Sequence, residues 1–264
     1  MPSLRRDDAV LYYEVSGSGP NLVLLHPFPL NHHFWDQVVP ALSRHHRVLA
    51  PDLRGHGESE LGEGPATMAK HADDLLALCD AEKIQRAAFV GVSIGGYVLF
   101  EFWRKHRERV SALVLSNTRA TAETEESRAN RLRIADDVLQ HGTDAFVEEM
   151  LGKLLGSTTR SERPEIVESA RRMMQQMSPE DIAEVQRGMA ERPDSVETLS
   201  SIDVPALVTA GEEDIPPLNA AELMHERISG SRLEVIAKAG HYAAMERPGE
   251  YSKLLLGFVG RIAE

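Results

Sequence analysis

The chain of 264 residues contains a single cysteine, Cys79, so it cannot form an intramolecular disulfide bond. Nothing in the sequence therefore requires an oxidising compartment. Cys79 lies in the helix-like stretch 73–82, where we expect a buried, unreactive thiol. The length suits one domain with an insertion and is short for two large domains.

Basic residues and long apolar runs are also scarce. Lys and Arg number 29 against 41 Asp and Glu, which leaves a net charge of -12. This charge repels phosphate backbones and anionic lipids, so neither nucleic acid nor a membrane is expected as a partner. No apolar run approaches the roughly 20 residues of a membrane helix, and the amino terminus lacks the apolar core of a signal peptide. We expect a soluble, cytoplasmic protein, and homo-oligomer formation is left open.

Metal and nucleotide motifs are missing as well. No pair of His or Cys residues shares a metal-site spacing with a third ligand. Gly55-His56-Gly57 is followed by Glu58 and lacks the pattern of a phosphate-binding loop. The sequence therefore predicts neither a metal nor a cofactor.

Short apolar runs rich in Val and Leu recur along the chain, and each ends at turn residues. Such runs fit central strands covered on both faces, and they lie at 21–25, 47–50, 87–92, 112–115, 206–210 and 233–236. Stretches with helical spacing lie between most of them, at 68–80, 96–106 and 218–228. This alternation predicts an α/β protein, with a mostly parallel sheet and helices on both faces.

The alternation is interrupted once, from about residue 121 to residue 198. This stretch is polar and rich in Glu, Arg and Met, with helical spacing and no convincing strand. Ser178 followed by Pro179 is typical of a helix start inside it. We expect a core domain formed by 1–120 and 199–264, with a helical cap, 121–198, inserted between two strands.

The segment Gly91-Val92-Ser93-Ile94-Gly95-Gly96 carries the strongest chemical signal. It joins an apolar strand to a helix, so Ser93 is expected on a sharp turn that needs small residues two positions to either side. The helix start favours a developing negative charge beside the serine. Ser93 is therefore the candidate nucleophile.

A serine hydroxyl needs a base that takes its proton and a carboxylate that orients the base. His241 is the best of eleven histidines, because it directly follows the strand 233–236. Asp214 is the expected carboxylate, and Glu213 is the alternative, because both follow the strand 206–210. His56 is expected to shape the site, and helix histidines such as His71 are expected to be solvated.

Acyl transfer also needs two donors for the oxyanion. One is the backbone N–H of Ile94, immediately after the nucleophile. The other is expected in the loop after the strand 21–25, where Pro27 and Pro29 have no N–H to donate and Phe28 remains. The side chain of Phe28 is expected to floor the pocket, and the bond into Pro29 is a candidate for the cis form.

These motifs together resemble the α/β-hydrolase family over nearly the whole chain. The matching segments are His26-Pro27-Phe28-Pro29, Pro51-Asp52-Leu53-Arg54-Gly55-His56-Gly57-Glu58-Ser59, Gly91-Val92-Ser93-Ile94-Gly95-Gly96, Gly211-Glu212-Glu213-Asp214 and Gly240-His241. The sequence looks most like the compact branch that contains 3-oxoadipate enol-lactonases, small esterases and cofactor-free haloperoxidases. The resemblance implies an oxyanion loop, a structural loop, the nucleophile, the acid and the base, in that order. Pro27 departs from the family, where His-Gly is usual.

The expected function is that of a serine hydrolase acting on a small carboxylic ester or lactone through an acyl-enzyme. Two alternatives share the same residues: a cofactor-free perhydrolase or haloperoxidase, and a ligand-binding regulator with slow turnover. The resemblance places substrate choice in the cap. Four methionines there suggest an adaptable apolar face over the site: Met173, Met174, Met177 and Met189. Of these, Met174 and Met177 are the expected substrate-binding residues.

Overall fold

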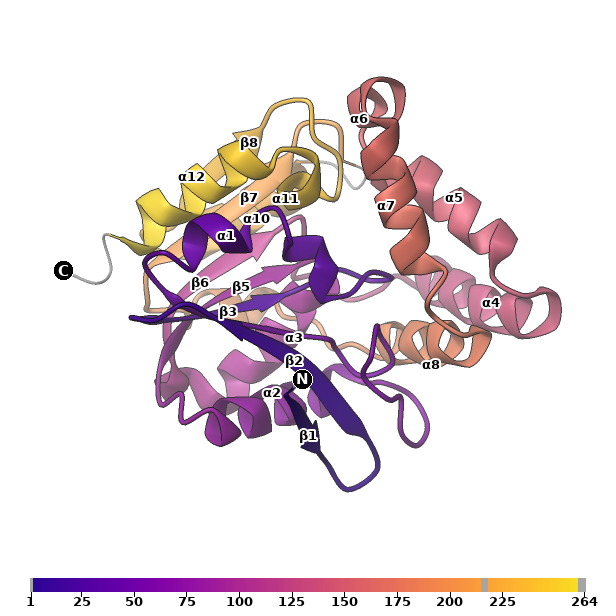
Figure 1. The fold of residues 1–264 in the computed structure, drawn as a ribbon, viewed down its shortest axis with the longest axis horizontal. Helices are drawn as coiled ribbons and strands as arrows, with labels where there is room; N and C mark the ends of the chain where they lie inside the picture. Colours follow the sequence, from indigo (N-terminus) through magenta and orange to yellow (C-terminus); the bar gives the residue numbers. More distant parts are fainter. Residues whose placement is uncertain (1, 215–217, 261–264) are drawn as a thin grey trace.

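The computed structural model describes residues 2–214 and 218–260. Its strands are β1 (Ser3–Arg5), β2 (Val10–Ser16), β3 (Asn21–Leu25), β4 (Arg47–Pro51), β5 (Ala87–Val92), β6 (Val110–Ser116), β7 (Ala206–Gly211) and β8 (Arg232–Ile236). Within the described residues they form one sheet in the order β1-β2-β4-β3-β5-β6-β7-β8 (Figure 1). β2 pairs antiparallel with β1 and β4, and the other neighbours run parallel.

β5 lies inside the sheet between β3 and β6, and all six of its residues are buried. Its apolar sequence follows from this position, because a parallel strand covered on both faces has no side that meets water. The six strands expected from the sequence are all present. The antiparallel pair β1 and β2 was not predicted, because neither segment is a continuous apolar run.

Helices cover both faces of the sheet. α1 (Val39–Leu42) and α12 (Pro248–Val259) lie on one face, and α2 (Met68–Ala81) and α3 (Ile94–His106) lie on the other (Figure 1). Shorter elements complete this part: η1 (His32–Trp35), η2 (Arg107–Arg109), α10 (Asn219–Arg227) and α11 (Ala243–Glu246). The expected fold class, a mostly parallel sheet between layers of helices, is confirmed.

A block of helices without any strand occupies the described stretch between β6 and β7. It contains α4 (Glu125–His141), α5 (Asp144–Leu154), α6 (Ser157–Glu162), α7 (Pro164–Met174), α8 (Pro179–Ala190) and α9 (Val196–Leu199). Ser178 caps α8 as expected, since its hydroxyl accepts from Asp181 N at 3.1 Å and Asp181 Oδ2 accepts from Ser178 N at 3.1 Å. Figure 1 shows α4 to α8 grouped beside the sheet. The division into a core and a cap with the boundaries given above stays a prediction.

The parallel strands bring distant parts of the chain to one edge of the sheet. Ser93 follows β5, Asn117 follows β6, Asp214 follows β7 and His241 follows β8. Because neighbouring parallel strands end on the same side, the residues that follow them gather there. The candidate site lies at this edge.

Candidate active site

Ser93 occupies the turn between β5 and α3 with a strained backbone. Its φ of 55° and ψ of -114° lie in a region that L-residues rarely adopt. Glycine is needed on both sides of it. A Cβ on Gly91 would lie 2.5 Å from the carbonyl of Gly95, and a Cβ on Gly95 would lie 2.7 Å from Leu25 O. The serine thus stands at the N-terminus of a long helix, in the geometry that its sequence motif predicts.

His241 and Asp214 are in direct contact. His241 Nδ1 lies 2.9 Å from Asp214 Oδ1 and 3.0 Å from Oδ2, and both side chains are more than nine-tenths buried. Because a carboxylate only accepts hydrogen bonds, Nδ1 carries the proton and Nε2 is left as an acceptor. Glu213, the alternative carboxylate, instead accepts hydrogen bonds from Ser157 and Thr158 at the start of α6.

Asn117, which the sequence motifs did not indicate, holds Asp214 in place. Its Nδ2 donates to Asp214 Oδ2 at 2.8 Å and approaches Gly240 O at 3.3 Å. Its φ of 47° is a conformation that Asn tolerates better than most residues. The sequence did contain one signal for Asn117. It is a polar residue directly after a parallel strand, and sites form at the edge of the sheet where such strands end.

Glu246 is a second residue that the motifs did not indicate. It is fully buried, and its carboxylate accepts from the N–H groups of Gly156, Gly240 and Tyr242 at 2.9, 3.0 and 3.1 Å. Gly240 and Tyr242 flank His241 in the chain, so Glu246 restrains the loop that carries the imidazole. Two of its three partners lie within six residues, and the third, Gly156, lies ninety positions away, so the sequence around Glu246 does not indicate the complete set of contacts.

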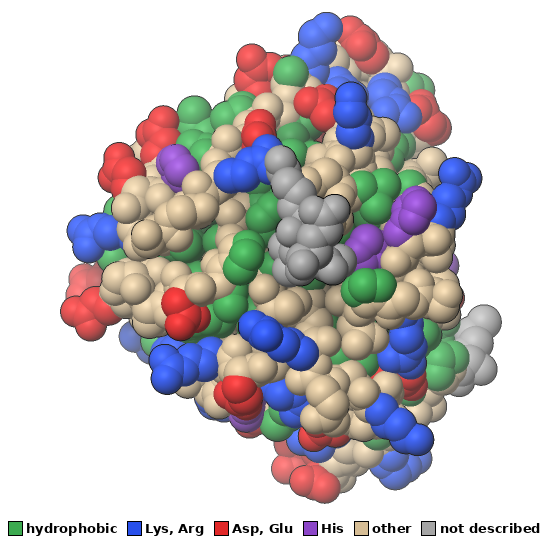
Figure 2. Space-filling view, turned by 90° about the vertical axis from the view of Figure 1, so that its left-hand side faces the viewer, with side chains coloured by type: hydrophobic (Ala, Val, Ile, Leu, Met, Phe, Trp, Pro, Cys, Tyr) green, Lys and Arg blue, Asp and Glu red, His purple; other side chains and the backbone are tan. Residues whose placement is uncertain are grey.

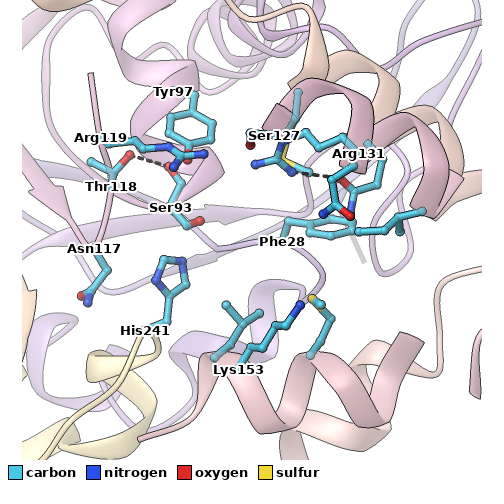
Figure 3. Close-up of a pocket in the computed structure, with 16 residues that line it drawn as sticks. Phe28, Ser93, Tyr97, Asn117, Thr118, Arg119, Ser127, Arg131, Lys153 and His241 are labelled. Atoms are coloured by element: carbon cyan, nitrogen blue, oxygen red, sulfur yellow. Dashed lines mark hydrogen bonds between the residues drawn. The ribbon is translucent and has the colours of Figure 1, made fainter. Parts of the chain in front are cut away.

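Ser93 and His241 line one cavity of about 300 Å³ (Figure 3). Phe28 also lines it, as expected, and its ring centroid lies 5.9 Å from that of Phe146. Further lining residues come from α4, α5 and α8. The inserted helices therefore complete the walls around the serine and the histidine.

The two expected oxyanion donors have free N–H groups. In the part of the chain that the structure describes, neither Phe28 N nor Ile94 N donates to an acceptor. Ile94 opens α3, where the first N–H groups of a helix lack intrahelical partners. The peptide bond between Phe28 and Pro29 is cis, and Phe28 O accepts from Tyr242 Oη at 3.2 Å.

The methionines at the cavity agree only in part with those expected. Met189 lines it as expected, whereas Met174 and Met177 are buried and do not belong to its lining. Met150, which was not expected, lines it as well. α7, which carries Met174, packs against α5 and α6, so its apolar side chains contribute to packing among these helices. Helical spacing alone could not indicate which side of each helix faces the serine.

The helix histidines outside the site differ in exposure. His141 and His225 are exposed as expected, whereas His71 is 1% exposed, which corrects the expectation that it is solvated. His56 is buried, with its ring centroid 5.8 Å from that of Phe28 and 5.0 Å from that of His26. His26 bonds to two backbone groups at 3.1 and 2.9 Å, and burial lowers its pKa to about 3. The imidazoles of His26 and His56 support the loop that contains Phe28 instead of lining the cavity.

Comparison with known families agrees with this geometry. Residues 20–248 match the family described as the alpha/beta hydrolase fold. The chain belongs to this family. The resemblance drawn from the sequence motifs is thereby confirmed.

Individual relatives place the chain in the expected branch. It is 29% identical to a putative 2-succinyl-6-hydroxy-2,4-cyclohexadiene-1-carboxylate synthase from Bacillus subtilis, over 95% of each chain. It is 26% identical to 3-oxoadipate enol-lactonase 1 from Acinetobacter baylyi, over 97% of this chain and 96% of that protein. Among solved structures, a thermophilic esterase from Thermogutta terrifontis in a malate-bound form is 36% identical, covers 99% of each chain and has a TM-score of 0.96. The expectation of a hydrolase is confirmed.

In the described ranges, no helix combines the length and the apolar character needed to cross a membrane.

Proposed function

We propose that the chain is a serine hydrolase that cleaves a small carboxylic ester or lactone. Ser93 is the nucleophile, His241 the general base and Asp214 the carboxylate that orients it. The observation that carries this proposal is one cavity lined by a serine on a strained strand-to-helix turn and by a histidine bonded to a buried carboxylate. This arrangement suits acyl transfer, because each group has a distinct task in it.

The first half-reaction follows from the hydrogen-bond directions. With its Nδ1–H donated to Asp214, His241 keeps a lone pair at Nε2 that accepts the proton of the Ser93 hydroxyl. The serine oxygen attacks the ester carbonyl, and the negative charge moves to the carbonyl oxygen. The imidazolium then protonates the leaving alcohol, which leaves an acyl group on Ser93.

The free N–H groups of Phe28 and Ile94 support a role as oxyanion donors. Preorganised donors of this kind each contribute about 3 kcal/mol to the transition state. In the second half-reaction, His241 takes a proton from water, the resulting hydroxide attacks the acyl-enzyme, and Ser93 recovers its proton as the acid leaves.

The substrate class rests on the cavity and on the relatives. A cavity of about 300 Å³ lies at the lower end of the roughly 300–1,000 Å³ usual for small-molecule sites, which favours a small ester or lactone. Relatives named as an enol-lactonase and an esterase support the same chemistry.

A serine-directed fluorophosphonate tests the proposal. We expect one label per chain, on Ser93, and complete loss of ester hydrolysis. His241→Ala should slow labelling, Ser93→Ala should prevent it, and Ser59→Ala, outside the cavity, should leave it unchanged. Ester hydrolysis by purified Ser93→Ala protein, or a label on Ser116, would refute the nucleophile assignment.

The same assays separate the two alternatives. Product formed faster with peroxide than with water would favour a perhydrolase. Labelling of Ser93 without steady turnover of several small esters would favour a slow-turnover regulator.

A further inference from the structure

Cationic side chains line the cavity beside Ser93. They are Arg119, Arg131 and Lys153, and no Asp or Glu belongs to the lining among the described residues. The chain as a whole carries a net charge of -12, and on the face drawn in Figure 2 acidic and basic side chains are interspersed. The cavity is therefore a local positive region in an acidic protein, which attracts anions.

A single buried carboxylate, Glu123, stands among three guanidinium groups. Its oxygens lie 2.9 Å from Arg119 Nη2, 3.0 Å from Arg131 Nε and 3.1 Å from Arg192 Nε. Although burial opposes ionisation, these cations and the Ser127 hydroxyl lower the pKa of Glu123 to about 2. In the described part of the chain no other carboxylate forms an ion pair with the three arginines. One negative charge against three positive charges leaves a surplus of two.

Two arginines line the cavity, and Arg119 has a donor to spare, whereas Arg131 already donates through Nη1 to Gln186 Oε1 at 2.8 Å. Arg119 Nε is buried and lacks a hydrogen-bond partner among the described residues. Arg119 directly follows Thr118, whose hydroxyl donates to Ser93 O at 2.8 Å, so this arginine enters next to the nucleophile. Figure 3 shows Arg119 beside Tyr97 and Ser93, and Arg131 with Ser127 on another side of the cavity.

The two arginines are less exposed to water than the lysine. The side chains of Arg119 and Arg131 are 26% and 17% exposed, whereas that of Lys153 is 58% exposed and pairs with Glu149. Water screens an exposed pair strongly, so the lysine contributes little to a fixed anion site. A partly buried guanidinium offers planar, paired donors that match a carboxylate.

We infer that the substrate is an ester or lactone carrying a second, ionised acid group, and that Arg119 and Arg131 bind that group. This inference rests on the function proposed above. An anion in the cavity that both arginines line supplies the negative charge that Glu123 alone does not, and the ester carbonyl then lies in the same cavity as Ser93. Apolar lining residues such as Ile134 and Met150 then cover the carbon chain between the two groups.

A matched pair of esters tests the inference. Monoethyl glutarate carries a terminal carboxylate, and ethyl 5-methylhexanoate replaces it with a neutral group of the same shape. We expect the wild type to have the higher kcat/KM for the anionic ester. Ethyl 4-phosphonobutanoate, measured in parallel, distinguishes a carboxylate from a phosphoryl group as the preferred acid.

Charge-removing variants then locate the anion site. Arg131→Gln and Arg119→Gln should each lower the ratio of the two kcat/KM values by about 10- to 100-fold, because each removes a charge-assisted hydrogen bond. Arg128→Gln removes the same charge from the exposed surface of α4 and should leave the ratio within about 2-fold. Arg131→Met removes the same charge and serves if the glutamine variant does not fold.

The outcomes separate this inference from the proposed function. A wild-type ratio below one, or equal losses on both esters in the arginine variants, would overturn the anion site while leaving Ser93 labelling intact. If Arg128→Gln lowered the ratio of the two kcat/KM values as much as Arg119→Gln and Arg131→Gln do, the preference would come from general electrostatic attraction and not from a site. Calorimetric titration of the protein with glutarate, and separately with neutral glutaramide, measures the affinity for the anion without turnover. Glutarate binding that weakens in Arg131→Gln would support the site even if Ser93 were not labelled.

Discussion

Replacement of Asp214 by Asn tests how the buried carboxylate controls His241. Asn117 Nδ2 donates to Asp214 Oδ2 at 2.8 Å, and this donor stays in the variant. The amide oxygen of the introduced side chain should therefore turn toward Asn117, which leaves the amide NH2 facing His241 Nδ1. Two donors cannot bond to each other, so Nδ1 loses its proton to Nε2. An imidazole protonated at Nε2 cannot accept the proton of Ser93.

The expected loss in kcat is about 10⁴-fold, or about 5 kcal/mol of transition-state stabilisation. The assay is hydrolysis of a neutral ester near pH 8, with the melting temperature as the check on folding. Glu213→Gln is the matched control, because it makes the same chemical change at a carboxylate that bonds to Ser157 and Thr158 instead.

A second substitution makes this test sharper. In the double variant Asp214→Asn, Asn117→Asp, the carboxylate at position 117 accepts from the amide NH2 at position 214. The amide oxygen is then free to accept from His241 Nδ1–H, and at least tenfold of the lost kcat should return. A folded Asp214→Asn protein with near-normal kcat, or a double variant with no recovery, would refute the reasoning.

Buried groups support three further predictions. Glu246→Gln should lower stability by about 2–3 kcal/mol in denaturant unfolding, because a buried amide NH2 replaces an acceptor of backbone N–H groups, and kcat should fall with it as the loop carrying His241 loosens. Met189→Ala should change the preferred ester chain length, whereas Met174→Ala should lower the unfolding free energy by about 2–5 kcal/mol and all ester rates alike. Because burial lowers the pKa of His26 to about 3, its contribution to stability is present above pH 6.5 and is lost as the pH falls toward 3. His26→Gln should therefore flatten the dependence of melting temperature on pH in that window, and an unchanged slope would contradict this.

The strand-turn-helix around Ser93 could be predicted from the sequence because its determinants are local. An apolar strand, glycines two positions to either side and a following helix lie within about twenty residues, and steric rules act at that range. The positions of His241 and Asp214 could also be predicted, because parallel strands end at one edge of the sheet and each of these residues follows a strand.

Side-chain placement across elements could not be predicted in the same way. Helical spacing in the inserted block indicated Met174, Met177 and Met189 alike, and only the packing of the helices decides that Met189 and Met150 line the cavity while Met174 and Met177 do not. Nothing in the polar, Glu/Arg-rich sequence indicated that Glu123, just before α4, is buried among three arginines.

The sequence by itself determined the fold class, the strand-to-helix turn at Ser93 and the positions of Asp214 and His241 after two neighbouring strands, since each depends on short-range pattern and on strand direction. The tertiary structure alone decided what surrounds them. Asn117 bonds to Asp214 across 97 positions, and Glu246 bonds to Gly156 across ninety. Arg119 and Arg131 line the cavity from different segments. Their roles depend on where segments meet in space, which no local pattern encodes.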